Sequence, residues 1–189
     1  MKALSLPHAL LGLLSYRPAT GYELKAAFKQ SIHFFWNATL PQIYRTLNQM
    51  RERGWVAVTV EHQEGRPSRK VYRITEAGRE EFRRWLAAPP EIPQPRDPLL
   101  VKVFFGRQAD PAVLAAHLKM WHAHYAGLLR RYEEEIAPLI RHYAALTGAR
   151  EDARYWSLTL EFGRRFARMA VDWCDAALAA VTQEDKAHG

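Results

Sequence analysis

The side chains best suited to chemistry in this sequence lie in a short polar run, QIYRTLNQ, at residues 42–49. If the run is helical, with 100° between successive residues, Gln42, Arg45 and Gln49 share one face. Arginine can donate two hydrogen bonds to a guanine edge, and glutamine can pair with an adenine edge. The spacing therefore indicates hydrogen bonding to base edges in the major groove of double-stranded DNA.

A basic turn follows at residues 64–72, EGRPSRKVY, between two runs rich in β-branched and aromatic residues. Arg66, Arg69 and Lys70 lie close together there, and Glu61 and Glu64 are the only acidic residues nearby. Like charges gathered on a hairpin repel one another unless an anion meets them. The turn is thus expected to contact the phosphate backbone of DNA.

Helix-start signals show how these side chains would be positioned. Thr20 and Glu23 form one capping-box pattern, and Thr39 and Gln42 form another, with Pro41 in the first turn of the helix that follows. The predicted order is a helix at 5–15, a helix from 21 that points Ile32 and Phe35 inward, a helix at 40–53, strands at 55–61 and 70–74, and a helix from 76. This order is typical of a winged helix-turn-helix, in which the third helix enters the major groove. The residues expected to meet DNA are Tyr22, Lys25, Thr39, Pro41, Gln42, Tyr44, Arg45, Gln49, Arg66, Arg69 and Lys70.

The charge balance agrees with an anionic partner for the first half of the chain. The 189 residues carry a net charge of +7, and residues 1–95 hold 14 Lys and Arg against 8 Glu. The single cysteine, Cys174, suits a reducing compartment, and no run is long and apolar enough to span a membrane. We expect a soluble, cytoplasmic protein that is not an enzyme and needs no cofactor or metal.

Prolines concentrate in the stretch AAPPEIPQPRDP, residues 87–98, which indicates a stiff linker. The predicted organisation is a DNA-binding domain at 1–88, a linker at 89–97, a helical dimerisation domain at 98–183 and a tail at 184–189. Helices are expected at 98–106, 111–146 and 151–181, with an interruption near 134–138 around Pro138. The predicted fold is mainly α with a small β-hairpin wing.

A heptad-like stripe runs along the last of these helices and indicates a helical partner. Its dimerisation candidates are Tyr155, Phe162, Phe166, Met169 and Trp173. The preceding helix offers a matching stripe of Leu114, Leu118, Trp121, Tyr125, Leu128 and Tyr132. Because two helices cannot bury both apolar faces alone, a second copy of the chain is expected to cover the rest.

Three alternatives remain open at this point. Trp121, Tyr125 and Trp156 could line a pocket for an aromatic effector, although aromatic residues at helical spacing more often form core or interface. The helical histidines (His117, His122, His124 and His142) could serve a metal or pH sensor, although they lack the i, i+4 spacing of helical zinc sites. The basic half could instead dock an acidic protein partner.

The first half strongly resembles the PadR family of transcriptional regulators over residues 5–88. The resemblance rests on GYEL at 21–24, FFW at 34–36, QIYRTL at 42–47, GRPSRKVY at 65–72 and ITEAGREEFRRWL at 74–86. DPLLVKVFFG at 97–106 and LEFGRRF at 160–166 are similar to the larger, virulence-activator branch of the family. The resemblance implies a homodimer that binds palindromic operator DNA, usually as a repressor, and responds to small aromatic or hydrophobic compounds.

Overall fold

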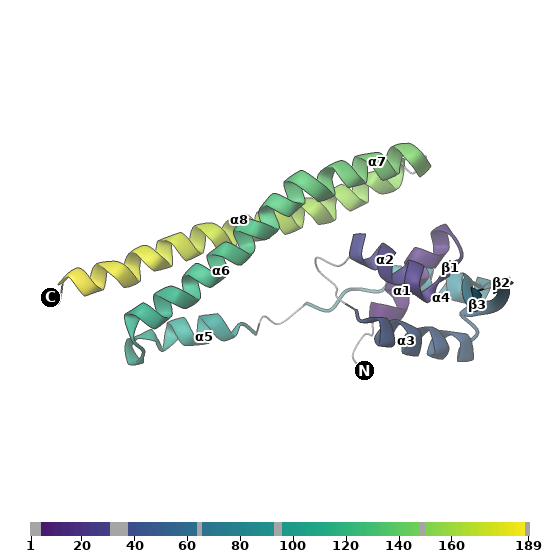
Figure 1. The fold of residues 1–189 in the computed structure, drawn as a ribbon, viewed down its shortest axis with the longest axis horizontal. Coiled ribbons are helices and arrows are strands. Elements are labelled where there is room, and N and C mark those ends of the chain that lie inside the picture. The colour runs from purple at the N-terminus through teal and green to yellow at the C-terminus, as the bar shows by residue number, and fades with distance from the viewer. Residues whose placement is uncertain (1–4, 31–37, 64–65, 93–95, 148–149, 188–189) are drawn as a thin grey trace. The chain divides into compact units, whose positions relative to one another are not determined.

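The computed structural model describes residues 5–30, 38–63, 66–92, 96–147 and 150–187. The chain divides into two compact units, unit 1 (Met1–Ile92) and unit 2 (Pro93–Gly189) (Figure 1). The division falls within the proline-rich stretch.

Unit 1 holds four helices and three strands in its described residues. They are α1 (Ser5–Tyr16), β1 (Ala19–Thr20), α2 (Gly21–Gln30), α3 (Leu40–Glu52), β2 (Val56–Gln63), β3 (Arg66–Ile74) and α4 (Glu76–Ala87). This order confirms the expected winged helix-turn-helix. The predicted inward positions Ile32 and Phe35 lie outside the described residues.

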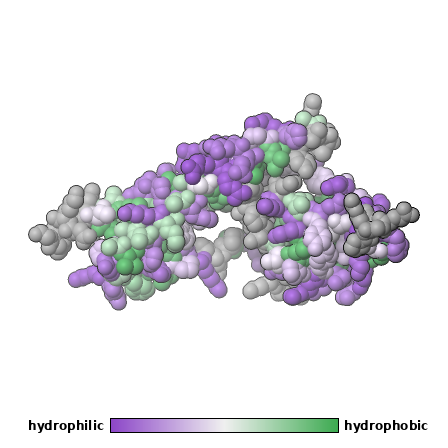
Figure 2. Space-filling model, in the orientation of Figure 1, coloured by the Kyte–Doolittle hydropathy of each residue, from purple (hydrophilic) through white to green (hydrophobic). Residues whose placement is uncertain are grey.

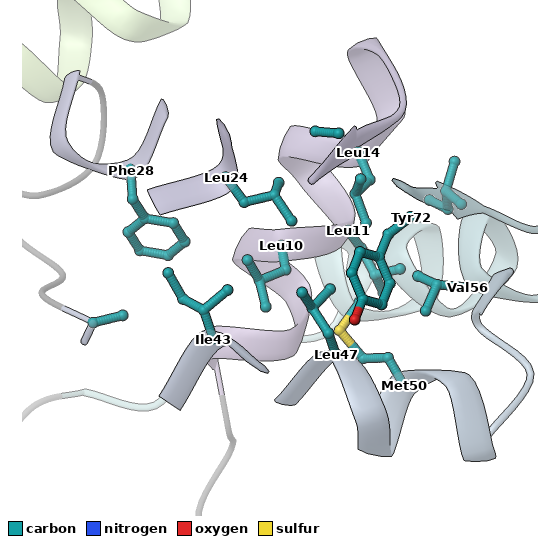
Figure 3. Close-up of a cluster of buried hydrophobic side chains, with 13 residues drawn as sticks. Leu10, Leu11, Leu14, Leu24, Phe28, Ile43, Leu47, Met50, Val56 and Tyr72 are labelled. Carbon is teal, nitrogen blue, oxygen red and sulfur yellow. The ribbon is translucent and has the colours of Figure 1, made fainter. Parts of the chain in front are cut away.

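The core of unit 1 forms where α1, α2 and α3 meet the sheet (Figure 3). Its fully buried side chains include Leu10 and Leu24, and Phe28 and Ile43 are just as well enclosed. Each such side chain stabilises the fold by about 1.5–3 kcal/mol through burial. The recognition-type helix α3 is therefore anchored by its apolar face, which leaves the opposite face outside.

The sheet contains a strand that the sequence analysis missed. β1 pairs antiparallel with β3, which also pairs with β2, so the strand order is β1-β3-β2. Two residues are too few to show an alternating pattern, and only the register Ala19↔Tyr72 identifies them as a strand. The hairpin strands are also longer than predicted, because β2 reaches Gln63 and β3 begins at Arg66.

The predicted helix signals around α2 and α3 are confirmed. The amide of Thr20 donates to Glu23 Oε2 at 2.7 Å, and the amide of Glu23 donates to Thr20 Oγ1 at 3.2 Å. Thr39 and Gln42 form the second capping box, at the start of α3. At the other end of α3, Gly54 has φ of +71°, a left-handed conformation that glycine adopts without steric cost.

The described residues of unit 2 form helices joined by short turns, with no strand among them. It contains α5 (Pro98–Phe104), the 3₁₀ turn η1 (Gly106–Gln108), α6 (Pro111–Arg131), the π-helix η2 (Tyr132–Ile136), α7 (Ala137–Thr147) and α8 (Arg150–Ala187). The expected interruption near 134–138 is confirmed as η2, which keeps the chain helical but adds a residue to the turn. α8 continues to Ala187, beyond its predicted end at 181.

The packing of α8 corrects one expectation. The stripe on α6 faces α8 as predicted, with Leu114, Leu118 and Tyr132 buried. However, α8 meets it mainly through a neighbouring stripe of small side chains, which includes Gly163, Ala167, Ala170 and Cys174. The predicted stripe stays largely exposed, but Trp173 packs on the α5–α6 cluster and the ring of Phe166 meets Tyr125 of α6. Small side chains let two helix backbones approach closely, so they outcompete larger aromatics for this position.

No helix among the described residues is both long and apolar enough to cross a membrane.

Apolar side chains gather on one part of the unit 2 surface, over α5 and the beginning of α6 (Figure 2). The most exposed of them is Phe104, of which 82% is accessible.

Candidate nucleic-acid interface

The outer face of α3 presents the polar side chains that the sequence singled out. Pro41, Gln42, Arg45 and Gln49 are exposed, whereas Ile43 and Met50 on the other side are fully buried. Arg45 has no ion-pair partner among the described residues, so its guanidinium is available to an external acceptor. Asn48, also on the outer face, is exposed as well.

Gln42 is partly committed to the start of its own helix. Its Oε1 accepts hydrogen bonds from the Thr39 amide at 2.8 Å and from the Thr39 hydroxyl at 3.0 Å. Only the side-chain NH₂ group remains for a base edge. The Thr39 hydroxyl in turn accepts a hydrogen bond from the backbone amide of Gln42, so both residues cap the N-terminus of α3.

Tyr44 lies on the flank of α3 and packs against the start of α2. A Cβ added to Gly21 would lie 2.5 Å from a ring carbon of Tyr44, so the absent side chain makes this approach possible. The ring of Tyr22 meets Tyr44 edge-on, with 6.3 Å between centroids. Partial burial raises the pKa of Tyr44, and the nearby Tyr22 raises it further by a smaller amount. Tyr44 thus fixes the angle of α3 on α2, while Tyr22 itself is 70% exposed.

Lys25 is half-buried, and its ammonium already has a partner within the chain. Its Nζ donates to the carbonyl oxygen of Ala38, at the residue that precedes the cap of α3. This bond ties α2 to the entry of α3. Its charge still adds to the positive field of unit 1.

The two basic wing residues that can be compared point to opposite faces of the hairpin. Arg69 is paired in register with Glu61, and Lys70 with Val60, so they alternate across β3. Arg69 Nε forms an ion pair with Glu61 Oε2 at 2.7 Å, whereas Lys70 is exposed with no ion-pair partner in the described part of the chain. The side chain of Arg66 lies outside the described residues.

A polar contact near the wing tip was missed by the sequence analysis. His62 Nδ1 and Ser68 Oγ lie 2.9 Å apart, across the two strands. Both side chains are exposed and could reach a phosphate. The register of the hairpin was the only signal that could have joined them, and it depends on the bulge between Glu61 and Gln63.

In unit 2, the proposed pocket aromatics separate along the helix pair. The rings of Trp121 and Tyr125 lie 5.6 Å apart, and Tyr125 meets Phe166 of α8 at 5.8 Å. Trp156 precedes Phe166 by ten residues of α8, a distance of about 15 Å along a helix. Trp121 also packs on the cluster of Leu99, which makes it part of a core.

The histidines of unit 2 do not converge. No group of three or more metal-ligating side chains occurs among the residues that the structure describes. His122 Nε2 lies 3.3 Å from Asp175 Oδ1, and the ring of His124 packs against Tyr125. These are ordinary contacts of a helix surface.

Together, a polar outer helix face and a basic hairpin beside it define a winged-helix DNA-binding protein. The comparisons agree: residues 10–84 match the PadR-like family of transcriptional regulators, and residues 95–182 match the C-terminal domain of virulence activator alpha. A probable transcriptional regulator of Mycobacterium tuberculosis is 35% identical over 96% of this chain and 100% of its own length. The chain therefore belongs to the PadR family of transcriptional regulators, which are not enzymes.

Solved structures extend the likeness to the whole fold. The virulence activator AphA of Vibrio cholerae superposes with a TM-score of 0.77 and 31% identity, covering 95% of this chain and 99% of its own. PadR of Bacillus subtilis in complex with operator DNA also gives a TM-score of 0.77, with 22% identity over 93% of this chain and 98% of its own. The same Bacillus protein has been solved in complex with p-coumaric acid, at a TM-score of 0.70 and 20% identity over 96% of this chain and 98% of its own.

Proposed function

We propose that this regulator is a repressor that binds a palindromic operator as a homodimer. The observation that carries the proposal is the exposed Arg45 on the outer face of α3, which has no ion-pair partner among the described residues, on a helix whose other face is fixed in the core. Such a helix can present a guanidinium to a guanine edge without rearranging. The operator complex of the Bacillus relative supports the same use of the fold.

The proposed contacts divide into two kinds. Arg45, Gln49 and the NH₂ group of Gln42 read base edges. Backbone contacts come from the helix N-terminus and from the wing, and comprise Tyr22, Lys25, Thr39, Pro41, Tyr44, Arg66, Arg69 and Lys70. Contacts of the second kind position the protein and carry no sequence information directly. Such a regulator would act on chromosomal DNA, in the cytoplasm.

The proposed dimer interface is the outer stripe of α8. Tyr155 is 64% exposed, Phe162 72% and Met169 53%, and Phe166 and Trp173 continue the stripe. A contiguous apolar stripe of this kind marks an interaction surface. A two-fold dimer would present two α3 helices to two half-sites of a palindrome.

Release by a small aromatic or hydrophobic effector completes the proposal. The p-coumaric acid complex of the Bacillus relative supports an effector for this chain as well. Trp121, Tyr125 and Trp156 remain the candidate aromatic contacts, although the structure separates Trp156 from the other two along α8.

The experiment that tests the proposal measures binding to the DNA upstream of the protein's own gene. The protein is titrated against this DNA and against random DNA at several salt concentrations. We expect a preference for the upstream DNA that survives at physiological salt, with a two-fold symmetric footprint. Equal, weak binding to both DNAs that vanishes with salt would leave only a non-specific field, and other operators would then be screened before the function is abandoned.

A further inference from the structure

A cavity of about 420 Å³ lies between α7 and α8, and none of Trp121, Tyr125 and Trp156 is among its lining residues. Ala137, Ile140 and Leu160 supply its apolar lining. None of them is aromatic, so the wall suits an aliphatic chain. The volume falls within the range of small-ligand sites, which is about 300–1,000 Å³.

The polar lining of the cavity is dominated by two guanidinium groups. Arg141 comes from α7 and Arg164 from α8, and the hydroxyl-bearing Ser157 lies two helical turns before Arg164. Glu161 is the one acidic residue among the described lining residues. Guanidinium groups match the geometry of a carboxylate with two parallel hydrogen bonds.

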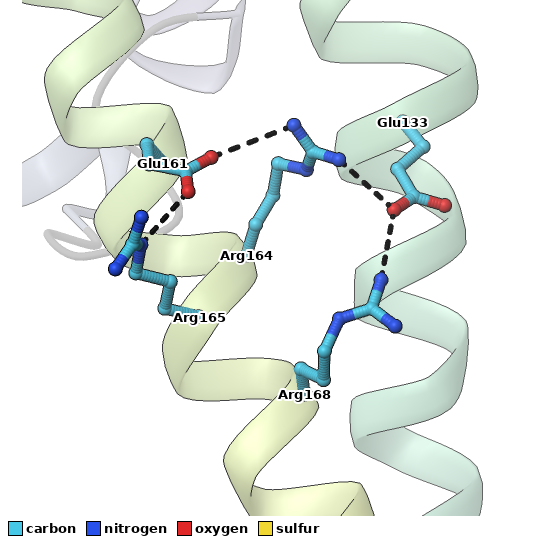
Figure 4. Close-up of polar contacts among 5 residues, drawn as sticks. All are labelled: Glu133, Glu161, Arg164, Arg165 and Arg168. Carbon is cyan, nitrogen blue, oxygen red and sulfur yellow. Dashed lines mark hydrogen bonds and ion pairs between the residues drawn. The ribbon is translucent and has the colours of Figure 1, made fainter.

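Arg164 is incompletely satisfied by its partners within the chain (Figure 4). Its Nη2 lies 3.3 Å from Glu133 Oε1, and its Nη1 lies 3.5 Å from Glu161 Oε2. A strong charge-assisted hydrogen bond measures about 2.7–2.9 Å. In addition, Nε of Arg164 is buried without a hydrogen-bond partner among the described residues. This side chain therefore retains donor capacity for a better-placed acceptor.

The surrounding charges favour an anion despite the presence of Glu161. Arg165 Nε lies 2.8 Å from Glu161 Oε1, and Arg168 Nη2 lies 3.3 Å from Glu133 Oε1. The hydrogen bond from Arg165 is the main cause that lowers the pKa of Glu161, so this group is a carboxylate at neutral pH. Arg141 has no ion-pair partner among the residues described. With Arg141 included, the positive charges of this cluster outnumber the negative ones.

We propose that this cavity binds a medium-chain aliphatic monocarboxylate. The ligand carboxylate lies between Arg141 and Arg164, and the hydrocarbon chain lies against Ala137, Ile140 and Leu160. The Ser157 hydroxyl adds no donor, because it already donates to the carbonyl oxygen of Ala153 at 2.7 Å. A neutral ligand of the same length would leave the guanidinium groups without this acceptor. The ligand class differs from the aromatic compounds considered above because the lining is aliphatic.

Occupancy of the cavity would reach the π-helix through Arg164. Glu133 lies in η2, and its carboxylate holds α8 through Arg164 and Arg168. A ligand that recruits Arg164 weakens one of these two ties. A change in DNA affinity caused by the weakened tie would rest on the proposed function. Binding of the ligand to the cavity does not depend on that function.

The test is isothermal titration of the full chain with octanoate, below its micelle concentration and without DNA. We expect one saturable site per chain for octanoate and at least tenfold weaker binding of octan-1-ol. Arg141→Gln should weaken octanoate binding at least tenfold, and Arg141→Lys less than that. Arg130→Gln is the matched control, since Arg130 is an exposed arginine of unit 2 outside the cavity, and should leave binding unchanged.

A second variant tests the cavity itself without changing its charge. Ala137→Leu places a larger side chain in the lining and should also weaken octanoate binding, with thermal unfolding confirming that the variant folds. The proposal is overturned if octanoate shows no saturable binding, if octan-1-ol binds equally well, or if Arg141→Gln and Ala137→Leu both bind as the parent does. Because no DNA is present, these outcomes are independent of the operator experiment.

Discussion

Arg45 and Arg69 differ in what already occupies their guanidinium groups. Arg45 has no ion-pair partner among the described residues, while Arg69 is held by Glu61 at 2.7 Å. Arg45 could therefore bind DNA without first breaking an ion pair. Arg69 could bind a phosphate only in competition with the Glu61 carboxylate. The sequence placed both residues near DNA, but pairing across a hairpin depends on its register, which was visible only in the structure.

Arg45→Ala is expected to weaken operator binding and to relax the sequence preference at one base pair of each half-site. A guanine contact of this kind contributes about 1–3 kcal/mol of discrimination. Binding to operators with that base pair changed, measured in parallel with the parent protein, gives the loss. Unchanged affinity and preference would favour a basic surface that docks a protein instead.

Glu61→Gln is expected to increase affinity for all DNA about equally, because it frees Arg69 for a phosphate. One added phosphate contact steepens the slope of log affinity against log salt by about 0.9. Salt-dependent binding to random DNA provides the measurement. Glu80→Gln, at an exposed residue of α4, is the charge-matched control, and an equal gain from both variants would show that only net charge matters.

At the scale of elements, the contact between α2 and α3 depends on the absence of a side chain at Gly21. Gly21→Ala places a methyl carbon 2.5 Å from a ring carbon of Tyr44, so the ring or the helices must shift. We expect the free energy of unfolding to fall by about 1–3 kcal/mol. In the Gly21→Ala/Tyr44→Ala double variant, the losses in free energy of unfolding should not add, because the clashing ring is gone. Chemical denaturation measures these losses. Full additivity would disprove the steric explanation.

The capping box of α2 gives unit 1 a pH-dependent contribution to stability. Hydrogen bonds from the Thr20 backbone amide and hydroxyl, in that order, lower the pKa of Glu23 below the ordinary value of a glutamate. The lowered pKa means that Glu23 stabilises the fold fully above the unfolded pKa and loses this effect as pH falls through the folded pKa. Glu23→Ala should therefore cost about 1 kcal/mol at pH 7 and progressively less below pH 4.5, measured by urea unfolding across that range. A deficit that stays constant with pH would contradict this cause.

Sequence patterns a few residues long predicted where helices begin and end. The sequence did not predict which helix faces pack together. Both capping boxes and the stop at Gly54 depend on residues a few positions apart, so they could be read from the sequence. α8 carries two adjacent stripes with the same heptad spacing, and the sequence favoured the one with larger side chains. Which stripe meets α6 depends on how closely two backbones can approach, a property of the helix pair and not of either helix alone. Similarly, Gln42 satisfied both a capping and a base-reading pattern, and only the geometry showed that its oxygen is already used.

At the scale of the whole molecule, the outer stripe of α8 should control assembly. Phe162→Glu puts a charge in the middle of the stripe without touching the face that packs on α6, because Phe162 is 72% exposed in the single chain. We expect a folded monomer with greatly reduced operator affinity, observed by sedimentation and by footprinting. Ala179→Glu, at another exposed position of α8, is the control and should remain dimeric; a dimeric Phe162→Glu would move the interface elsewhere.

If a second copy covers the outer stripe of α8, the lifetime of the protein depends on its abundance. A chain that has not met a second copy exposes Phe162, Tyr155 and Met169 to water, and with them a surface that proteases and chaperones recognise. If pairing covers this stripe, stability follows the law of mass action and rises with the number of copies in the cell. At low concentration the unpaired chains would be degraded quickly, and at high concentration the paired chains would persist. The amount of regulator would therefore show a concentration threshold set by this pairing.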